Sequence, residues 1–170
     1  MAFSFRATRR ACYCGYVVQA IVNNLAPLFF IIFSERYGIS YRGLGSLVMI
    51  NFAVQLGIDA LCIKLVNPIG YRPLLVAAQG LSAAGLILLG ILPLLLKPVY
   101  AALVIAVTVY ALGGGLLEVL VSPVVDSIPG AAEQKPAAMS LLHSFYCWGQ
   151  MAVILLSTLL LSLIGLERWY

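Results

Sequence analysis

Glu118 and His143 are the two residues of this chain best suited to proton chemistry. Both lie inside long apolar stretches, where an ionisable side chain is costly and normally faces a cavity or a partner. A carboxyl and an imidazole group at one depth can together bind and release a proton near neutral pH. We therefore expect Glu118 and His143 to couple proton movement to transport. A fixed hydrogen-bonded pair between adjacent helices is the alternative.

Other polar side chains recur at helical spacing, so that four of the five long apolar stretches of the chain carry one polar stripe each. At 1.5 Å per residue, Gln19, Gln55, Glu118 and His143 all lie about 12–14 Å from the cytoplasmic end of their stretches. Polar groups at one level near the bilayer centre predict a cavity that binds a polar solute. The expected cavity residues are Gln19, Asn23, Asn24, Asn51, Gln55, Glu118, His143, Tyr146 and Gln150. For each amide, a hydrogen bond that only holds two helices together is the alternative.

Some polar groups are interpreted differently. Asp59 is only five residues from Lys64, so we expect a structural or gating charge on the cytoplasmic side. The pair Cys12 and Cys14 is spaced more tightly than zinc ligands and has no second pair, so no metal or other cofactor is expected. An enzyme is not expected either, although Ser140 or Ser144 beside His143 leaves an intramembrane hydrolase as a minor alternative.

The elements that position these residues follow from composition. Hydrophobic residues make up 63% of the 170 residues and charged residues 9%, and the mean hydropathy is +1.05. A soluble domain is about 45–50% apolar and about 25% charged, so the solvent of this chain must be lipid. The composition predicts an all-α integral membrane protein with a single transmembrane domain over 1–170. Five stretches are long enough to span a bilayer, at about 11–33, 43–63, 74–96, 99–124 and 137–164.

Basic residues set the expected orientation. Six Lys and Arg fall on the side of the N-terminus and four on the opposite side, and Arg6, Arg9 and Arg10 precede the first span. The positive-inside rule therefore predicts a cytoplasmic N-terminus in a multi-pass protein of the plasma or inner membrane. The net charge of +4 suits anionic headgroups and does not indicate a nucleic acid partner.

Small residues predict where helices approach closely. The third span has Gly80 with Ala84 and Ala78 with Ser82 at four-residue spacing, and the fourth has three glycines at 113–115. The third span carries little polarity besides Gln79, so we expect it at the periphery of the cavity.

Three segments resemble transporters of the major facilitator superfamily. Residues 18–28 (VQAIVNNLAPL) resemble the first helix of bacterial members, and Gly113–Glu118 followed by Ser122 and Pro123 is similar to their fourth. Residues 140–149 (SLLHSFYCWG) resemble the fifth helix of the fucose-permease-like branch. The resemblance spans nearly the whole chain, as helices one to five of the N-terminal six-helix bundle.

The resemblance implies import of a sugar or similar small polar solute by proton symport, with alternating access to a central cavity. The family signature between helices two and three keeps only Gly70 and Arg72 here, as a turn and a cytoplasmic charge with a gating role. A complete member has twelve helices, so we expect a missing C-terminal half, a second copy or another chain to supply the opposite wall. A non-transporting membrane scaffold, an assembly subunit or an inactive remnant is the alternative.

Overall fold

The computed structural model describes residues 5–129 and 134–165, and every element in that part of the chain is a helix. The loop residues 130–133, and Arg168 with its neighbours after the fifth span, lie outside the described residues. The helices are α1 (Phe5–Leu28), α2 (Phe30–Tyr37), α3 (Tyr41–Ile69), α4 (Tyr71–Leu95), α5 (Val99–Ser127) and α6 (Gln134–Ile164).

Five segments are long and apolar enough to cross a membrane: Phe5–Tyr37, Tyr41–Ile69, Tyr71–Leu95, Val99–Ser127 and Lys135–Ile164. The expectation of five membrane-spanning helices is therefore confirmed at this level. Most helices extend beyond the predicted apolar runs, because the helical backbone continues past the hydrocarbon core and keeps its hydrogen bonds satisfied. The first span is broken next to Pro27. The Phe29 amide bonds to the Ala26 carbonyl at 3.1 Å, one residue closer than in an α-helix, and this tight turn separates α1 from α2.

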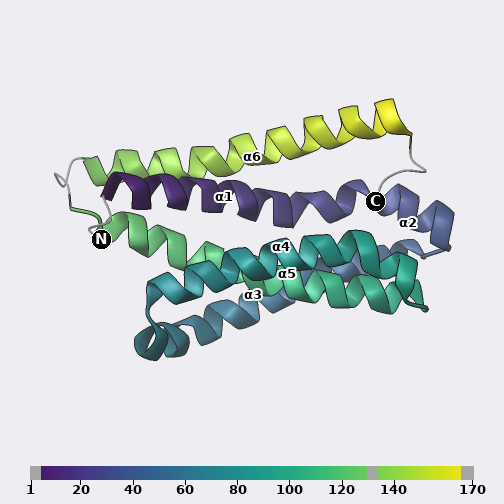
Figure 1. Cartoon of the computed structure of the whole chain (residues 1–170), viewed down its shortest axis with the longest axis horizontal. Helices are drawn as coiled ribbons and strands as arrows, with labels where there is room; N and C mark the ends of the chain where they lie inside the picture. The colour runs from purple at the N-terminus through teal and green to yellow at the C-terminus, as the bar shows by residue number, and fades with distance from the viewer. Residues whose placement is uncertain (1–4, 130–133, 166–170) are drawn as a thin grey trace.

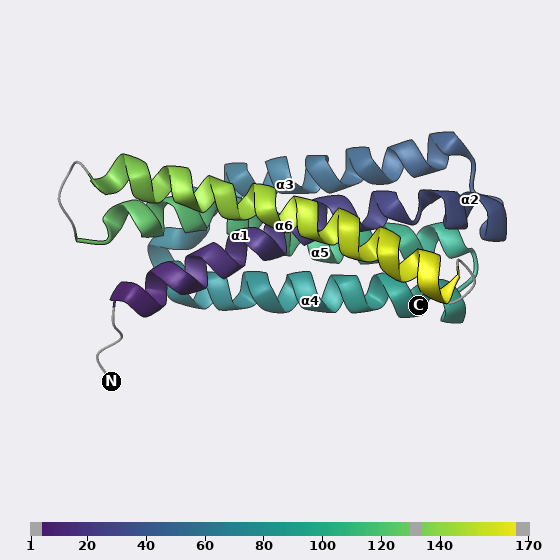
Figure 2. The same ribbon diagram turned by 90° about the horizontal axis from the view of Figure 1, so that it is seen from above.

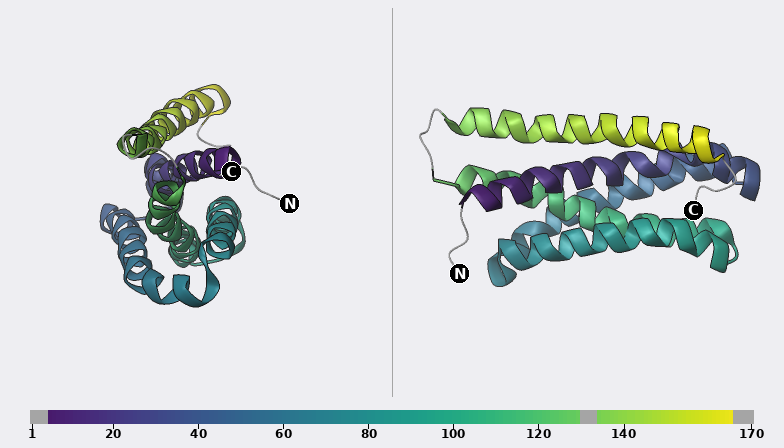
Figure 3. Two further views of the ribbon diagram at one scale, coloured as in Figure 1. Left: turned by 90° about the vertical axis from the view of Figure 1, so that its left-hand side faces the viewer. Right: turned by 45° about the horizontal axis from the view of Figure 1, so that its top comes forward.

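The helices form an elongated bundle in which successive spans run in opposite directions (Figures 1 and 2). Helix α5 lies in its middle and contacts α1, α3, α4 and α6. Figure 3 shows this from the end, with α3 and α4 on two sides of α5 and the α1–α6 pair on a third. Helix α5 thus has other helices on three sides, while Glu118 of its polar stripe remains exposed.

Three consecutive glycines allow α5 to occupy this central place. Successive helix positions are about 100° apart, so each glycine faces a different neighbour. A Cβ on Gly113 would meet Ser82 of α4, and one on Gly114 would lie 2.8 Å from Val22 Cγ1 of α1. A Cβ on Gly115 would lie 3.0 Å from Gln55 Cα of α3. Any side chain here would push one helix away from α5.

Helix α4 packs on α5 through one of the two small-residue faces noted in its sequence. Ala78 and Ser82 are fully buried, whereas Gly80 and Ala84 are exposed. Gly85 continues the buried face, and a Cβ there would fall 2.6 Å from Tyr110 Cα of α5. The close helix contact therefore runs along Ala78, Ser82 and Gly85, and the face with Gly80 and Ala84 is open.

Two apolar clusters form the core, one towards each end of the bundle. Val22, Phe33 and Leu103 belong to one, and Cys12, Cys62 and Leu120 belong to the other. Between them lie three buried amide side chains, Gln19, Asn51 and Gln55, which are 2–5% exposed. The middle of the bundle is therefore a polar layer between two hydrophobic ones.

Candidate functional site

One face of α1 organises the polar residues. Tyr16, Gln19 and Asn23 follow each other at three- and four-residue spacing, so they lie on one side of the helix. Each forms hydrogen bonds to other helices of the bundle. We call these three residues and their partners the polar ladder. The partners are Ser122 and Glu118 of α5, Asn51 and Gln55 of α3, and Tyr146 of α6.

Asn23 joins three helices through one amide group. Its Oδ1 accepts from Gln55 Nε2 at 2.8 Å and from Asn51 Nδ2 at 3.3 Å, both on α3. Its Nδ2 donates to the Tyr146 hydroxyl of α6 at 3.3 Å. Gln55 also donates to Asn51 Oδ1 at 3.2 Å, one helical turn away. Asn23 thus uses donors and acceptors together to fix α3 and α6 on either side of α1.

The other two steps of the ladder lead to α5. Gln19 Nε2 donates to Glu118 Oε2 at 3.0 Å, and the Tyr16 and Ser122 hydroxyls are 2.8 Å apart. Glu118 and Ser122 are one turn apart, so the two bonds lie on the same face of α5. Four helices, α1, α3, α5 and α6, therefore meet at the ladder, while α4 contributes no residue to it.

Glu118 differs from the amides because its side chain lies at the surface of the chain. It is exposed, as is His143 on α6, and Tyr146 and Gln150 are half-buried. A carboxylate at the centre of a membrane helix is strongly disfavoured in contact with lipid. This face of the bundle therefore requires water or another protein segment over it.

Glu118 and His143 form no hydrogen bond to each other among the described residues. The ring of Tyr16 meets His143 edge-on with ring centroids 5.5 Å apart, and the Tyr16 hydroxyl bonds to Ser122, one turn along α5 from Glu118. The fixed hydrogen-bonded pair considered above is therefore not the arrangement observed.

Several expected site residues lie outside this arrangement. Asn24 donates to the Ala20 carbonyl of its own helix at 2.8 Å, and Gln150 takes no part in the ladder. Gly70, with φ of 85°, forms the turn between α3 and α4, and Arg72 is exposed in the first turn of α4. Both residues lie at the end of the bundle where α3 joins α4, and neither belongs to the ladder.

Asp59 follows the point where α3 crosses α5. Gln55 and Ile58 of α3 pack against Gly115 of α5, and α3 and α5 run in the same direction (Figure 1). Asp59 is one residue beyond Ile58 and Glu118 is three residues beyond Gly115, so both carboxyl groups follow the same crossing, within range of an electrostatic interaction. The structural or gating role of Asp59 on the cytoplasmic side stays a prediction.

Two acceptor atoms at the site have no donor among the described residues. Gln19 Oε1 and Asp59 Oδ1 are both buried and without a hydrogen-bond partner. Gln19 is 2% exposed, so water reaches it poorly. An unpaired buried acceptor is unfavourable, and a proton or a donor group at this level would satisfy it.

Sequence reasoning missed Tyr16 and did not include Ser122 among the site residues. Tyr16 is three residues before Gln19, and the same periodicity that joined Gln19 to Asn23 extends to it. A tyrosine in an apolar stretch is easily taken for a packing residue, since only its hydroxyl is polar.

Comparisons with protein-family models, with curated proteins and with solved structures find no match for this chain.

Proposed function

We propose that this chain is the N-terminal part of a secondary active transporter that moves a small polar solute, with proton coupling at Glu118 and His143. One observation carries the proposal: an exposed carboxyl group, held by a buried glutamine, at the middle of a membrane-length helix bundle. Transporters place binding sites at this depth, between two bundles that rock about the site.

The groups around Glu118 support a proton-binding role. Gln19 donates to it from α1, and the Asp59 carboxyl group of α3 lies within range of an electrostatic interaction. Tyr16, whose ring meets His143, bonds to Ser122 one turn along α5 from Glu118. When Glu118 and Asp59 are both ionised, their like charges repel each other. Protonation of one carboxyl group removes that repulsion, so gain or loss of a proton changes the charge of the site.

The solute class follows from the neighbouring side chains. Amide groups and hydroxyls offer both donors and acceptors, as the hydroxyl groups of a sugar require. Tyr146 and His143 add flat rings beside these groups. The resemblance to fucose-permease-like transporters supports a sugar over other polar solutes.

A second wall completes the proposed cavity. The five helices leave the face with Glu118 open, and alternating access requires a partner bundle on that side. A C-terminal half or a second copy of the chain would supply it.

The test is uptake by the protein purified from its source membrane, together with any partner that copurifies, in proteoliposomes with an imposed pH gradient. The probes are radiolabelled L-fucose, D-galactose and D-glucose. We expect Glu118→Gln to bind sugar but to lose the response of uptake to the pH gradient. Asp126→Asn is the matched control, because it removes a carboxylate from the end of the same helix, where it is 61% exposed.

If uptake by Glu118→Gln responds to the gradient as in the wild type, the proton-coupling role is wrong. If no wild-type uptake occurs and Glu118→Gln only lowers stability, the ladder serves a membrane scaffold instead.

A further inference from the structure

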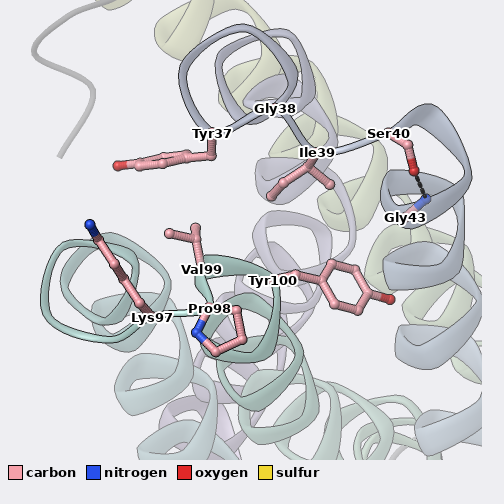
Figure 4. Close-up of a pocket in the computed structure, with 9 residues that line it drawn as sticks. All are labelled: Tyr37, Gly38, Ile39, Ser40, Gly43, Lys97, Pro98, Val99 and Tyr100. Carbon is pink, nitrogen blue, oxygen red and sulfur yellow. Dashed lines mark hydrogen bonds between the residues drawn. The ribbon is translucent and has the colours of Figure 1, made fainter.

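A second group of donors lies at the end of the bundle opposite the N-terminus. There the α2–α3 turn and the α4–α5 turn line an open pocket of about 490 Å³ (Figure 4). Its lining residues are Tyr37, Gly38, Ile39, Ser40, Gly43, Lys97, Pro98, Val99 and Tyr100. Tyr100, one of these lining residues, shares a hydrogen bond between its hydroxyl and that of Ser46, which joins α5 to α3.

The pocket is positively charged and lacks a counter-charge. Lys97 is the charged residue among the described residues of the lining, and none of those is an Asp or Glu. Figure 4 shows the Lys97 amine and the Tyr37 hydroxyl extending towards the same side of the pocket. The Tyr37 hydroxyl is buried and has no hydrogen-bond partner among the described residues. A cation and an unpaired donor at one mouth favour an anionic ligand with oxygen acceptors.

Two helix N-termini add to this field. The first turns of α3 and α5 both line the pocket, and helix N-termini carry partial positive charge. Ser40 caps α3 by accepting from the Gly43 amide at 3.3 Å, whereas Pro98 gives α5 no side-chain cap. The backbone N–H groups of Val99 and Tyr100 are in the first turn of α5, where no earlier carbonyl of the same helix can accept from them. These amides also require an acceptor.

Apolar side chains next to the pocket indicate what carries the anion. Leu94, Leu95 and Leu96 directly precede Lys97 and are 48%, 72% and 43% exposed. They end a membrane-length helix, so they lie where acyl chains meet headgroups. A ligand with an anionic head and apolar tails would contact both surfaces at once.

We propose that this pocket binds the phosphate of an anionic phospholipid from the leaflet opposite the N-terminus. Lys97 contacts the phosphate, Tyr37 donates to it, and the lipid tails lie along Leu94–Leu96. The site is separate from the polar ladder, and the inference does not depend on the proposed transport function.

The test measures lipid binding to the purified full chain by native mass spectrometry, from mixed micelles of phosphatidylglycerol and phosphatidylcholine. We expect phosphatidylglycerol to be retained selectively. Lys97→Gln should weaken its binding about tenfold, because a charged hydrogen bond is lost. Tyr37→Phe, which keeps the ring, should weaken it by about threefold or more. Arg42→Gln is the matched control, because it removes an exposed cation in the first turn of α3 that does not line the pocket.

Three results would overturn the proposal. Equal losses for Arg42→Gln and Lys97→Gln would mean general surface charge rather than a site. Equal retention of phosphatidylcholine would mean that the anionic charge is not recognised. Displacement of phosphatidylglycerol by millimolar inorganic phosphate would assign the pocket to a soluble anion. If Lys97→Gln does not fold, Tyr37→Phe alone decides, and wild-type affinity in that variant refutes the role of its hydroxyl.

Discussion

Neighbouring asparagines in α1 provide a sharp test of the polar ladder. Asn23 forms three hydrogen bonds to other helices, with Asn51, Gln55 and Tyr146. Hydrogen bonds between membrane helices contribute on average about 0.6 kcal/mol each and at most about 1.7. Three of them give about 2 kcal/mol, so we expect Asn23→Ala to lower the free energy of unfolding by about that amount.

Asn24 is the matched control. It is half-buried, as Asn23 is, but its amide donates to the Ala20 carbonyl within the same helix at 2.8 Å. Membrane helices persist when the bundle comes apart, so this bond survives unfolding and contributes little to stability. Asn24→Ala should therefore change the free energy of unfolding by less than about 0.5 kcal/mol.

The assay is reversible unfolding of the purified chain by sodium dodecyl sulfate in mixed micelles, followed by tryptophan fluorescence. Equal effects of the two substitutions, or a neutral Asn23→Ala, would contradict the interhelical bonding of the ladder. A larger loss for Asn24→Ala would mean that the α1 face is rotated from the one described.

Two further predictions concern packing and the α5–α6 loop. Gly85→Ala should lower the free energy of unfolding by about 1–3 kcal/mol, because the new methyl group would overlap the Tyr110 backbone, whereas Gly80→Ala, with open space around it, should change it by less than about 1 kcal/mol. The same unfolding assay compares them, and equal effects would mean that α4 does not approach α5 at Gly85. Asp126→Asn breaks the 3.7 Å ion pair with Lys135. Because both side chains are exposed, the free energy of unfolding should stay within about 0.5 kcal/mol of wild type in low and in high salt.

The polar stripes illustrate how far helical periodicity can lead. Spacing placed Gln19 and Asn23 on one face of α1 and Asn51 and Gln55 on one face of α3. Asn23 does bond to Asn51 and Gln55, whereas Gln19 bonds to Glu118 of α5. The same spacing could not say that Asn24 bonds to its own helix, because a short amide can reach either a neighbouring helix or the carbonyl four residues back. The choice depends on whether another helix is close enough on that side.

The crossing of α3 and α5 shows a second limit of sequence reasoning. The distance of Asp59 along the chain from Lys64 predicts a charge on the cytoplasmic side, but it could not show that Gln55 and Ile58 pack against Gly115 a short way before Asp59. The crossing point depends on how the two helices pack, which sequence distance does not set.

The sequence by itself determined the solvent and the number of spans. Five apolar runs, bounded by charged residues, must become helices because a backbone in lipid has to satisfy its own hydrogen bonds. It also determined which side chains share a helix face, since that follows from 3.6 residues per turn. Only the tertiary structure decided that α5 is central, that α1 pairs with α6, and that Tyr16 bonds to Ser122 of α5 while its ring meets His143 of α6. These are contacts between residues far apart in the chain, and they depend on how closely the glycines of α5 let its neighbours approach.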